Sequence, residues 1–174
     1  MSTTAPACES DLIIRIWQQL AALRRLSFVA RPGPGSTTGW SGRGQAELSP
    51  ESAGADWRLV ERGRFQPAGA ARDVAFHNIY RWQRLADGLA LSHERFGTDA
   101  AVFLFELVDD GQGRLVSRAG HHCGADVYAA QLVPMADGFT LDWTIRGPAK
   151  NERLYYHYST HSPEPANDKR PRHV

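Results

Sequence analysis

The chain has 174 residues, enough for one domain with a sizeable core, and its 42% hydrophobic and 22% charged residues are ordinary for a globular protein. A net charge of +1 gives no basic face, so no nucleic-acid partner is expected. The two cysteines, Cys8 and Cys123, are not expected to form a disulfide framework. The acidic start at Glu9 and Asp11 is unlike a secretory signal, and no apolar run is long enough to span a bilayer. The sequence therefore predicts a cytoplasmic protein without a membrane partner and leaves the oligomeric state open.

Residues 1–9 are predicted to be disordered, and a helix is predicted over residues 10–25. Ser10 is a good N-cap, and Asp11 suits the positive end of the helix dipole. Apolar residues then recur at helical spacing, which predicts one face packed on the same domain. The alternative is a structural or interaction role in which this stripe binds a partner. The stripe consists of Leu12, Ile13, Ile16, Leu20 and Leu23.

The rest of the chain alternates between apolar and polar residues, which predicts short strands joined by Asp-Gly and Gly-Pro turns. With no crossover helix, the strands form an antiparallel meander that closes into a barrel. Residues 10–159 are thus predicted to be one mainly β domain, an antiparallel up-and-down β-barrel with one N-terminal helix, and 160–174 a disordered tail. The predicted strands are 26–31, 38–48, 57–66, 73–86, 89–96, 101–108, 113–119, 126–134, 138–147 and 151–159.

The strand predicted over 73–86 carries aromatic and polar side chains on the same face. A face of this kind suits a barrel lumen in which polar groups orient a ligand. The alternative is that the aromatic side chains are core and Arg84 lies at the rim. This face contains Phe76, Asn78, Tyr80, Trp82 and Arg84.

The sequence His121-His122-Cys123 is followed closely by Asp126 and Tyr128. On a strand, His121 and Cys123 point one way and His122 the other. His121 as base, Cys123 as nucleophile and Asp126 would make a catalytic group, but no glycine-rich turn into a helix supplies an oxyanion hole. The alternative is a hydrogen bond between a histidine and Asp126 at a barrel end, with Cys123 packed as a small hydrophobe. A second ligand pair for zinc is missing, so no metal is expected.

Two glycine-containing turns complete the pattern. Gly147-Pro148 forces a turn that ends near Lys150, which would attract an anionic group at a barrel mouth or be a solvated turn residue. The run 40–44, Trp-Ser-Gly-Arg-Gly, is not a nucleotide cradle, because no helix and no Gly-Lys-Ser/Thr follow. Its glycines would let a strand bend at a barrel corner, with Trp40 closing one barrel end.

The helix, the Gly39-Trp40 pair and the uninterrupted meander resemble the calycin superfamily, which includes lipocalins and fatty-acid-binding proteins. The run 40–44 also resembles the start of nitrobindin-type haem barrels, a likeness that implies haem binding through one histidine. The candidate haem ligands are His77, His93, His121, His122 and His157.

Motifs in the C-terminal half are similar to a bacterial and fungal domain-of-unknown-function family of lipocalin-like barrels. The likeness spans most of residues 26–159 and implies a fold but no established activity. It rests on Tyr80-Arg81-Trp82, on His121 with Cys123, Asp126 and Tyr128, and on Trp143 with Gly147-Pro148 and Lys150.

The sequence thus favours a protein that binds a small, partly apolar and anionic ligand in a barrel lumen. An enzyme using His121, Asp126 and Cys123 and a haem-binding barrel are the alternatives, and no other cofactor is expected. Aromatic side chains would wall the lumen, and charged or polar ones would orient the ligand. The predicted ligand-binding residues are Tyr80, Trp82, Arg84, His121, Asp126, Tyr128, Trp143 and Lys150.

Overall fold

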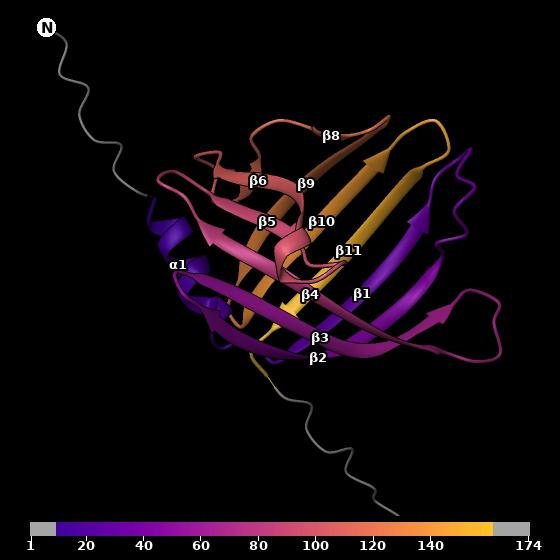
Figure 1. The fold of residues 1–174 in the computed structure, drawn as a ribbon, viewed down its shortest axis with the longest axis horizontal. Coiled ribbons are helices and arrows are strands. Elements are labelled where there is room, and N and C mark those ends of the chain that lie inside the picture. The colour runs from indigo at the N-terminus through magenta and orange to yellow at the C-terminus, as the bar shows by residue number, and fades with distance from the viewer. Residues whose placement is uncertain (1–9, 162–174) are drawn as a thin grey trace, which may run out of the picture.

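A computed structural model describes residues 10–161, and these residues form a closed antiparallel β-barrel with a helix at one end (Figure 1). The predicted mainly β barrel is therefore confirmed. The predicted disordered segments lie outside the described residues, except for Thr160 and His161. The elements are α1 (Asp11–Leu20), β1 (Arg25–Pro32), β2 (Gly42–Ala53), β3 (Asp56–Pro67), β4 (Val74–Arg84), β5 (Leu89–His93), the short 3-10 helix η1 (Thr98–Ala100), β6 (Val102–Asp109), β7 (Leu115–Ser117), β8 (His121–Cys123), β9 (Asp126–Met135), β10 (Gly138–Arg146) and β11 (Asn151–Ser159).

The barrel follows chain order. Strands β1 to β7 pair in chain order, and β9, β10 and β11 do the same. Strand β11 closes the barrel on β1. Strands β7 and β8 pair with the same edge of β9, at Leu132 and Tyr128 respectively, so the barrel has ten strand positions. The sequence did not predict β8 as a separate strand. Strand β7 is shorter than the strand predicted over 113–119, and a short irregular stretch separates it from β8.

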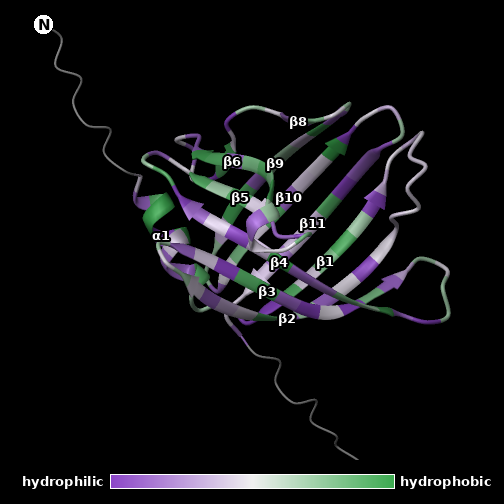
Figure 2. Cartoon of the chain, viewed as in Figure 1, coloured by the Kyte–Doolittle hydropathy of each residue, from purple (hydrophilic) through white to green (hydrophobic). Residues whose placement is uncertain are grey.

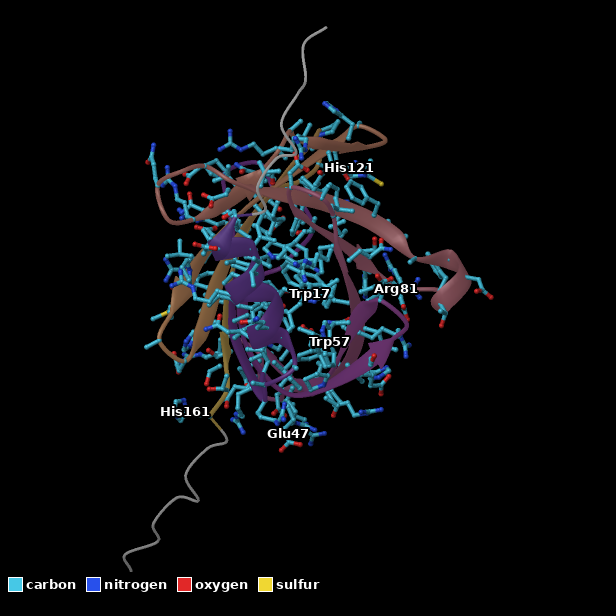
Figure 3. The ribbon with its side chains drawn as sticks, turned by 90° about the vertical axis from the view of Figure 1, so that its left-hand side faces the viewer. Trp17, Glu47, Trp57, Arg81, His121 and His161 are labelled. Atoms are coloured by element: carbon cyan, nitrogen blue, oxygen red, sulfur yellow. The ribbon has the colours of Figure 1, made fainter. Side chains whose placement is uncertain are left out.

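Helix α1 covers the end of the barrel where β1 begins. The N-cap prediction is confirmed, because the Leu12 N–H donates to Ser10 Oγ at 3.2 Å. The apolar stripe from Leu12 to Leu23 is buried in the same cluster as the barrel core, as predicted for a helix that packs on its own domain. Figure 3 looks at this end, with α1 nearest the viewer and Trp17 beside it. No helix in the described part of the chain has the length and apolarity needed to cross a bilayer.

The helix ends at Leu20 rather than at residue 25, so that boundary was wrong. Arg24 donates to the carbonyls of Ala21 and Leu23 and thereby satisfies backbone groups just beyond the helix end. Arg25 already pairs with Ser159 in the barrel. The chain must turn here because burying Leu23 and the first core residue of β1 requires a change of direction.

Apolar and polar residues alternate along the strands. Figure 2 shows this alternation as bands of hydrophobic and hydrophilic residues on β1, β3 and β4. The predicted shared face of β4 is confirmed: Trp82 lies opposite Trp57, Tyr80 opposite Leu59 and Asn78 opposite Glu61. Paired residues in an antiparallel sheet point to the same face. The barrel interior is therefore mostly apolar, with a few polar side chains from neighbouring strands.

The end opposite α1, here called the barrel mouth, is bordered by the loop 33–41, the turns at 68–73, 124–125 and 147–150, and the β5–β6 connection 94–101 (Figure 1). The predicted strand 38–48 began too early, because residues 33–41 form a loop that docks on the β10–β11 turn. The N–H of residue 33 donates to the carbonyl of residue 151 at 2.6 Å, and that of residue 37 to the carbonyl of residue 149 at 3.1 Å. The Pro-Gly insertion is therefore part of the mouth.

Candidate functional site

One row of interior-facing residues crosses four strands at the mouth. Glu152 on β11 lies opposite Ile145 on β10, Ile145 lies opposite Tyr128 on β9, and Tyr128 lies opposite His121 on β8. Directly opposed residues have Cβ atoms about 4.5–5.5 Å apart, so neighbours in the row are in contact distance. The register therefore places two predicted site residues, His121 and Tyr128, in one row with a carboxylate that was not among the predicted site residues.

In the β8–β9 hairpin, His121 and Cys123 lie on one face of the strand and His122 on the other, as predicted. His121 is half-buried, and its ring meets Phe103 edge-on with centroids 4.8 Å apart. Cys123 lies opposite Asp126 and is exposed, so it is not the packed small hydrophobe of the alternative prediction. His122 is exposed on the other face.

Asp126 and Lys150 form an ion pair at the mouth, with Nζ and Oδ2 2.6 Å apart. The hydrogen bond to Asp126 raises the pKa of Lys150 against the opposing effect of burial, and Tyr128 adds to the rise. The Lys150 charge is thus already balanced within the protein. The same pair weakens the catalytic hypothesis, because the carboxylate that would orient His121 is bound to a lysine instead.

Gly147 explains why a Gly-Pro turn precedes Lys150. A Cβ atom at position 147 would collide with Oδ1 of Asp126. The turn is closed by hydrogen bonds in both directions between the backbones of Gly147 and Lys150. A glycine at this position therefore lets the β10–β11 turn lie against β9 and hold the ion pair together.

Glu152 is only 5% exposed, although it lies close to a loop. Its Oε1 accepts hydrogen bonds from the hydroxyls of Ser36 and Thr38 in the loop 33–41. Its Oε2 is buried without a hydrogen-bond partner among the described residues. Asn-Glu-Arg at the start of β11 resembles a solvated charged turn, which is why the sequence analysis passed over this residue. Glu152 stands two residues before Leu154 on the strand, and this spacing indicates that both side chains face the interior.

Three predicted wall residues, Tyr80, Trp82 and Trp143, are buried in the barrel. Tyr80 stacks on His93 at 4.7 Å and meets Trp143 edge-on at 5.8 Å. The indole nitrogens of Trp82 and Trp143 are buried and lack a partner in the described structure. Because β4 runs from the mouth toward α1, Trp82 and the exposed Arg84 lie at the α1 end. The predicted ligand-binding set is therefore divided between the two ends of the barrel.

A continuous chain of aromatic contacts leads from the rim into the interior. Trp40 stacks on Phe65 with centroids 6.1 Å apart, and Phe65 on Phe28 at 5.7 Å. Phe28 then stacks on Tyr156 at 5.1 Å, and Tyr156 on Trp143 at 5.3 Å. Trp40 remains 51% exposed, so it borders the mouth and does not close a barrel end as predicted. Five strands or loops contribute to this aromatic chain, so no single sequence segment revealed it.

A glutamate lies deeper in the interior. Glu61 is 0% exposed and accepts hydrogen bonds from Asn78 at 3.3 Å and from the Tyr158 hydroxyl at 3.2 Å. Burial raises its pKa to about 7, although both hydrogen bonds favour the ionised form. Tyr80 and Tyr156 share a side-chain hydrogen bond close by. The burial of Glu61 is not evident from the sequence, because this residue stands among arginines, where a solvated face is the ordinary interpretation.

The histidines predicted as candidate haem ligands do not gather at one place. His77 and His122 are exposed, and His157 lies on the outer face, 4.0 Å from Asp137. His93 and His121 occupy interior positions, and burial, followed by the charge of a nearby arginine, lowers the pKa of His93. Within residues 10–161 there is no group of three or more His, Cys, Asp or Glu side chains arranged to hold a metal ion.

Two depressions lie on the outer face of the barrel, over β1, β2 and their neighbours, with volumes of about 410 and 660 Å³. They meet at Arg43 and Gln45, and arginines line much of the larger one. Tyr155 and His157 line the smaller one. No predicted ligand-binding residue lines either depression, although Phe28 of the aromatic chain lines the smaller one.

Fold and site together define a closed antiparallel β-barrel with buried polar side chains at its mouth and in its interior. The chain belongs to DUF6314, a family of unknown function whose model matches residues 33–160. The match covers the loop 33–41 and the strands from β2 to β11, and therefore nearly all of the mouth. No curated protein and no solved structure is significantly similar to the chain.

Proposed function

We propose that the protein binds a small, partly apolar molecule at the barrel mouth, a role in keeping with the predicted calycin-like fold. The observation that carries this proposal is the aromatic chain from exposed Trp40 to buried Trp143, whose indole N–H has no partner among residues 10–161. Aromatic rings supply apolar contact area, and a buried donor without a partner is unfavourable unless water or a ligand meets it. A ligand that reaches Trp143 would satisfy that donor.

The rim of the mouth supports entry of an apolar molecule. Four of the exposed large hydrophobic residues belong to elements that border it: Trp40 at 51% exposed, Val74 at 57%, Phe96 at 73% and Phe103 at 39%. Single exposed apolar residues are common, but a group of them around one opening is typical of a binding surface. This rim would receive the apolar part of a ligand before the aromatic chain does.

The polar end of the ligand has two buried groups to meet. The Trp143 indole offers a donor, and Oε2 of Glu152 offers an acceptor. Trp143 lies opposite Leu154 and Ile145 opposite Glu152, so the two groups belong to diagonal neighbours on one face, whose Cα atoms lie about 7–8 Å apart. The predicted role of Lys150 in holding an anion loses its support, because Asp126 already balances its charge.

Haem is a second candidate ligand, favoured by one observation. His93 lies in the interior beside Tyr80, and its lowered pKa keeps the imidazole neutral, which is the form that binds iron. Haem added to the full chain would then give a Soret band that is lost in His93→Ala and kept in His77→Ala. The absence of a band in the wild-type protein would reject haem and leave other small ligands in place.

The proposal is tested by titrating the full chain with the neutral probe N-phenyl-1-naphthylamine, which fluoresces in apolar surroundings. A saturable rise is expected. Tyr128→Ala, which alters the mouth, should raise the dissociation constant about fivefold or more. The matched control Tyr155→Ala alters the outer depression and should leave the dissociation constant unchanged. No saturable signal, or an effect of Tyr155→Ala alone, would contradict binding at the mouth.

A further inference from the structure

We infer that the natural ligand carries a cationic nitrogen, as in an amine or amidine, and that Glu152 receives it. This inference rests on the proposed function and specifies the class of ligand. It starts from a carboxylate that is 5% exposed, faces the interior in the strand register and has one oxygen without a hydrogen-bond partner among the described residues. The ligand predicted from the sequence was anionic, whereas the ligand inferred from Glu152 is cationic.

The buried position of Glu152 requires partners for its carboxylate. A carboxylate removed from water stays ionised only when donors or an opposite charge replace its hydration. Ser36 and Thr38 serve Oε1 of Glu152, and both are neutral hydroxyls. They hold the carboxylate in place but leave its charge unbalanced, and Oε2 is left for a further donor.

The nearby cations of the protein are already occupied. Lys150 pairs with Asp126 at 2.6 Å. Arg153, next to Glu152 in sequence, lies on the opposite face of β11 and pairs with Asp142. Neither cation is therefore available to Glu152, which forms no ion pair with any of the described residues. A ligand cation would provide the opposite charge.

The surroundings of Glu152 also favour a cation with an apolar body. Ile145 lies opposite Glu152, and Tyr128 follows in the same row. Trp143 and Tyr156, which belong to the aromatic chain, lie one and two interior positions deeper on β10 and β11. Aromatic faces attract ammonium and guanidinium groups through their quadrupole, and this attraction grows when water is excluded. The loop 33–41, which carries both hydroxyl donors, would fix the geometry of recognition.

The test compares three probes with the same phenyl body and different charge: 2-phenylethylamine, 2-phenylethanol and phenylacetate. Each is titrated into the ¹⁵N-labelled full chain at about pH 7, and the resonances of Tyr128 and Trp143 report binding at the mouth. The amine should bind about tenfold more tightly than the alcohol, and phenylacetate most weakly. Glu152→Gln should reduce the advantage of the amine to about twofold or less. The matched control Glu47→Gln, on the outer face, should retain it.

The outcomes separate this inference from the proposed function. Equal binding of amine and alcohol at the mouth, or tightest binding of phenylacetate, would overturn the inference and leave ligand binding at the mouth standing. If none of the three probes moves a mouth resonance and N-phenyl-1-naphthylamine also fails to bind, the proposed function itself is rejected. If Glu152→Gln does not fold, the order of the three affinities in the wild-type protein still decides the sign of the charge.

Discussion

Tyr158 donates a hydrogen bond to Glu61 in the barrel interior, at 3.2 Å and across 97 positions of sequence. Both side chains are almost completely buried. Burial, and after it the nearby Glu61 carboxylate, raises the pKa of Tyr158 far above its ordinary value, so this hydroxyl stays a donor. The pair joins β3 to β11 through the interior and gives the barrel a titratable group that water does not reach.

Stability should fall with rising pH because of Glu61. Its pKa is raised from 4.5 to about 7 on folding, so the folded state keeps a proton that the unfolded state releases. The contribution is fully present below about pH 4.5 and is lost as pH rises through about 7. Relative to Glu61→Gln, the wild-type protein should lose about 2–4 kcal/mol over this interval, measured by urea unfolding. Glu47→Gln is the control, and a pH-independent difference between wild type and Glu61→Gln would contradict the raised pKa.

Removing the Tyr158 hydroxyl should destabilise the barrel. In Tyr158→Phe one oxygen of Glu61 loses its donor in a fully buried site, which should cost about 1–3 kcal/mol. Tyr155→Phe, on the exposed face of the same strand, should cost less than about 0.5 kcal/mol. Urea unfolding at one pH measures both. Equal effects of the two substitutions would show that the buried hydrogen bond does not contribute.

The Asp126–Lys150 ion pair should affect the binding of anions at the mouth more than it affects the stability of the fold. The side chains are 37% and 19% exposed for Lys150 and Asp126, so water screens the pair, and Lys150→Met should cost less than about 1 kcal/mol. Asp126→Asn should release the lysine charge and strengthen phenylacetate binding severalfold, while Asp142→Asn on the outer face should not. Unchanged phenylacetate binding in Asp126→Asn would mean that Asp126 does not mask Lys150.

The helix contributes to the core and not only to the barrel end. Leu20 is 0% exposed and belongs to the same cluster as the barrel residues, so Leu20→Ala should cost about 2–5 kcal/mol. The exposed neighbour Gln18→Ala serves as control and should have little effect. Thermal unfolding would show a single lowered transition in Leu20→Ala. A separate early transition would indicate that α1 detaches from an intact barrel.

The fold was predictable because its signals are local. Period-2 alternation and Asp-Gly turns located most strands, and parity correctly placed Tyr80 and Trp143 inside. The predicted boundaries are wrong where contacts between distant segments override the local sequence pattern. The helix ends earlier than predicted because Leu23 and β1 join the barrel. The strand predicted from residue 38 begins only at Gly42, because the loop 33–41 docks on the β10–β11 turn.

The candidate site was predictable only in part, because its composition depends on register. Sequence showed that Asp126 and Tyr128 share a face, but not that Lys150 would pair with Asp126. The burial of Glu61 and Glu152 was not predictable from the sequence, because a charged residue beside arginines is usually solvated. Their burial follows from contacts with Tyr158, from 97 positions away, and with the loop 33–41, which only the closed barrel brings together.

Binding at the mouth can be measured most directly at the indole N–H of Trp143, assigned by its loss in Trp143→Phe. On saturation with N-phenyl-1-naphthylamine, we expect this resonance to shift strongly, because the ligand reaches a donor that has no partner among the described residues. The indole resonance of Trp82, at the α1 end, should change little. A Trp143 indole that stays unchanged while the Tyr155 amide on the outer face shifts would contradict a binding site at the mouth.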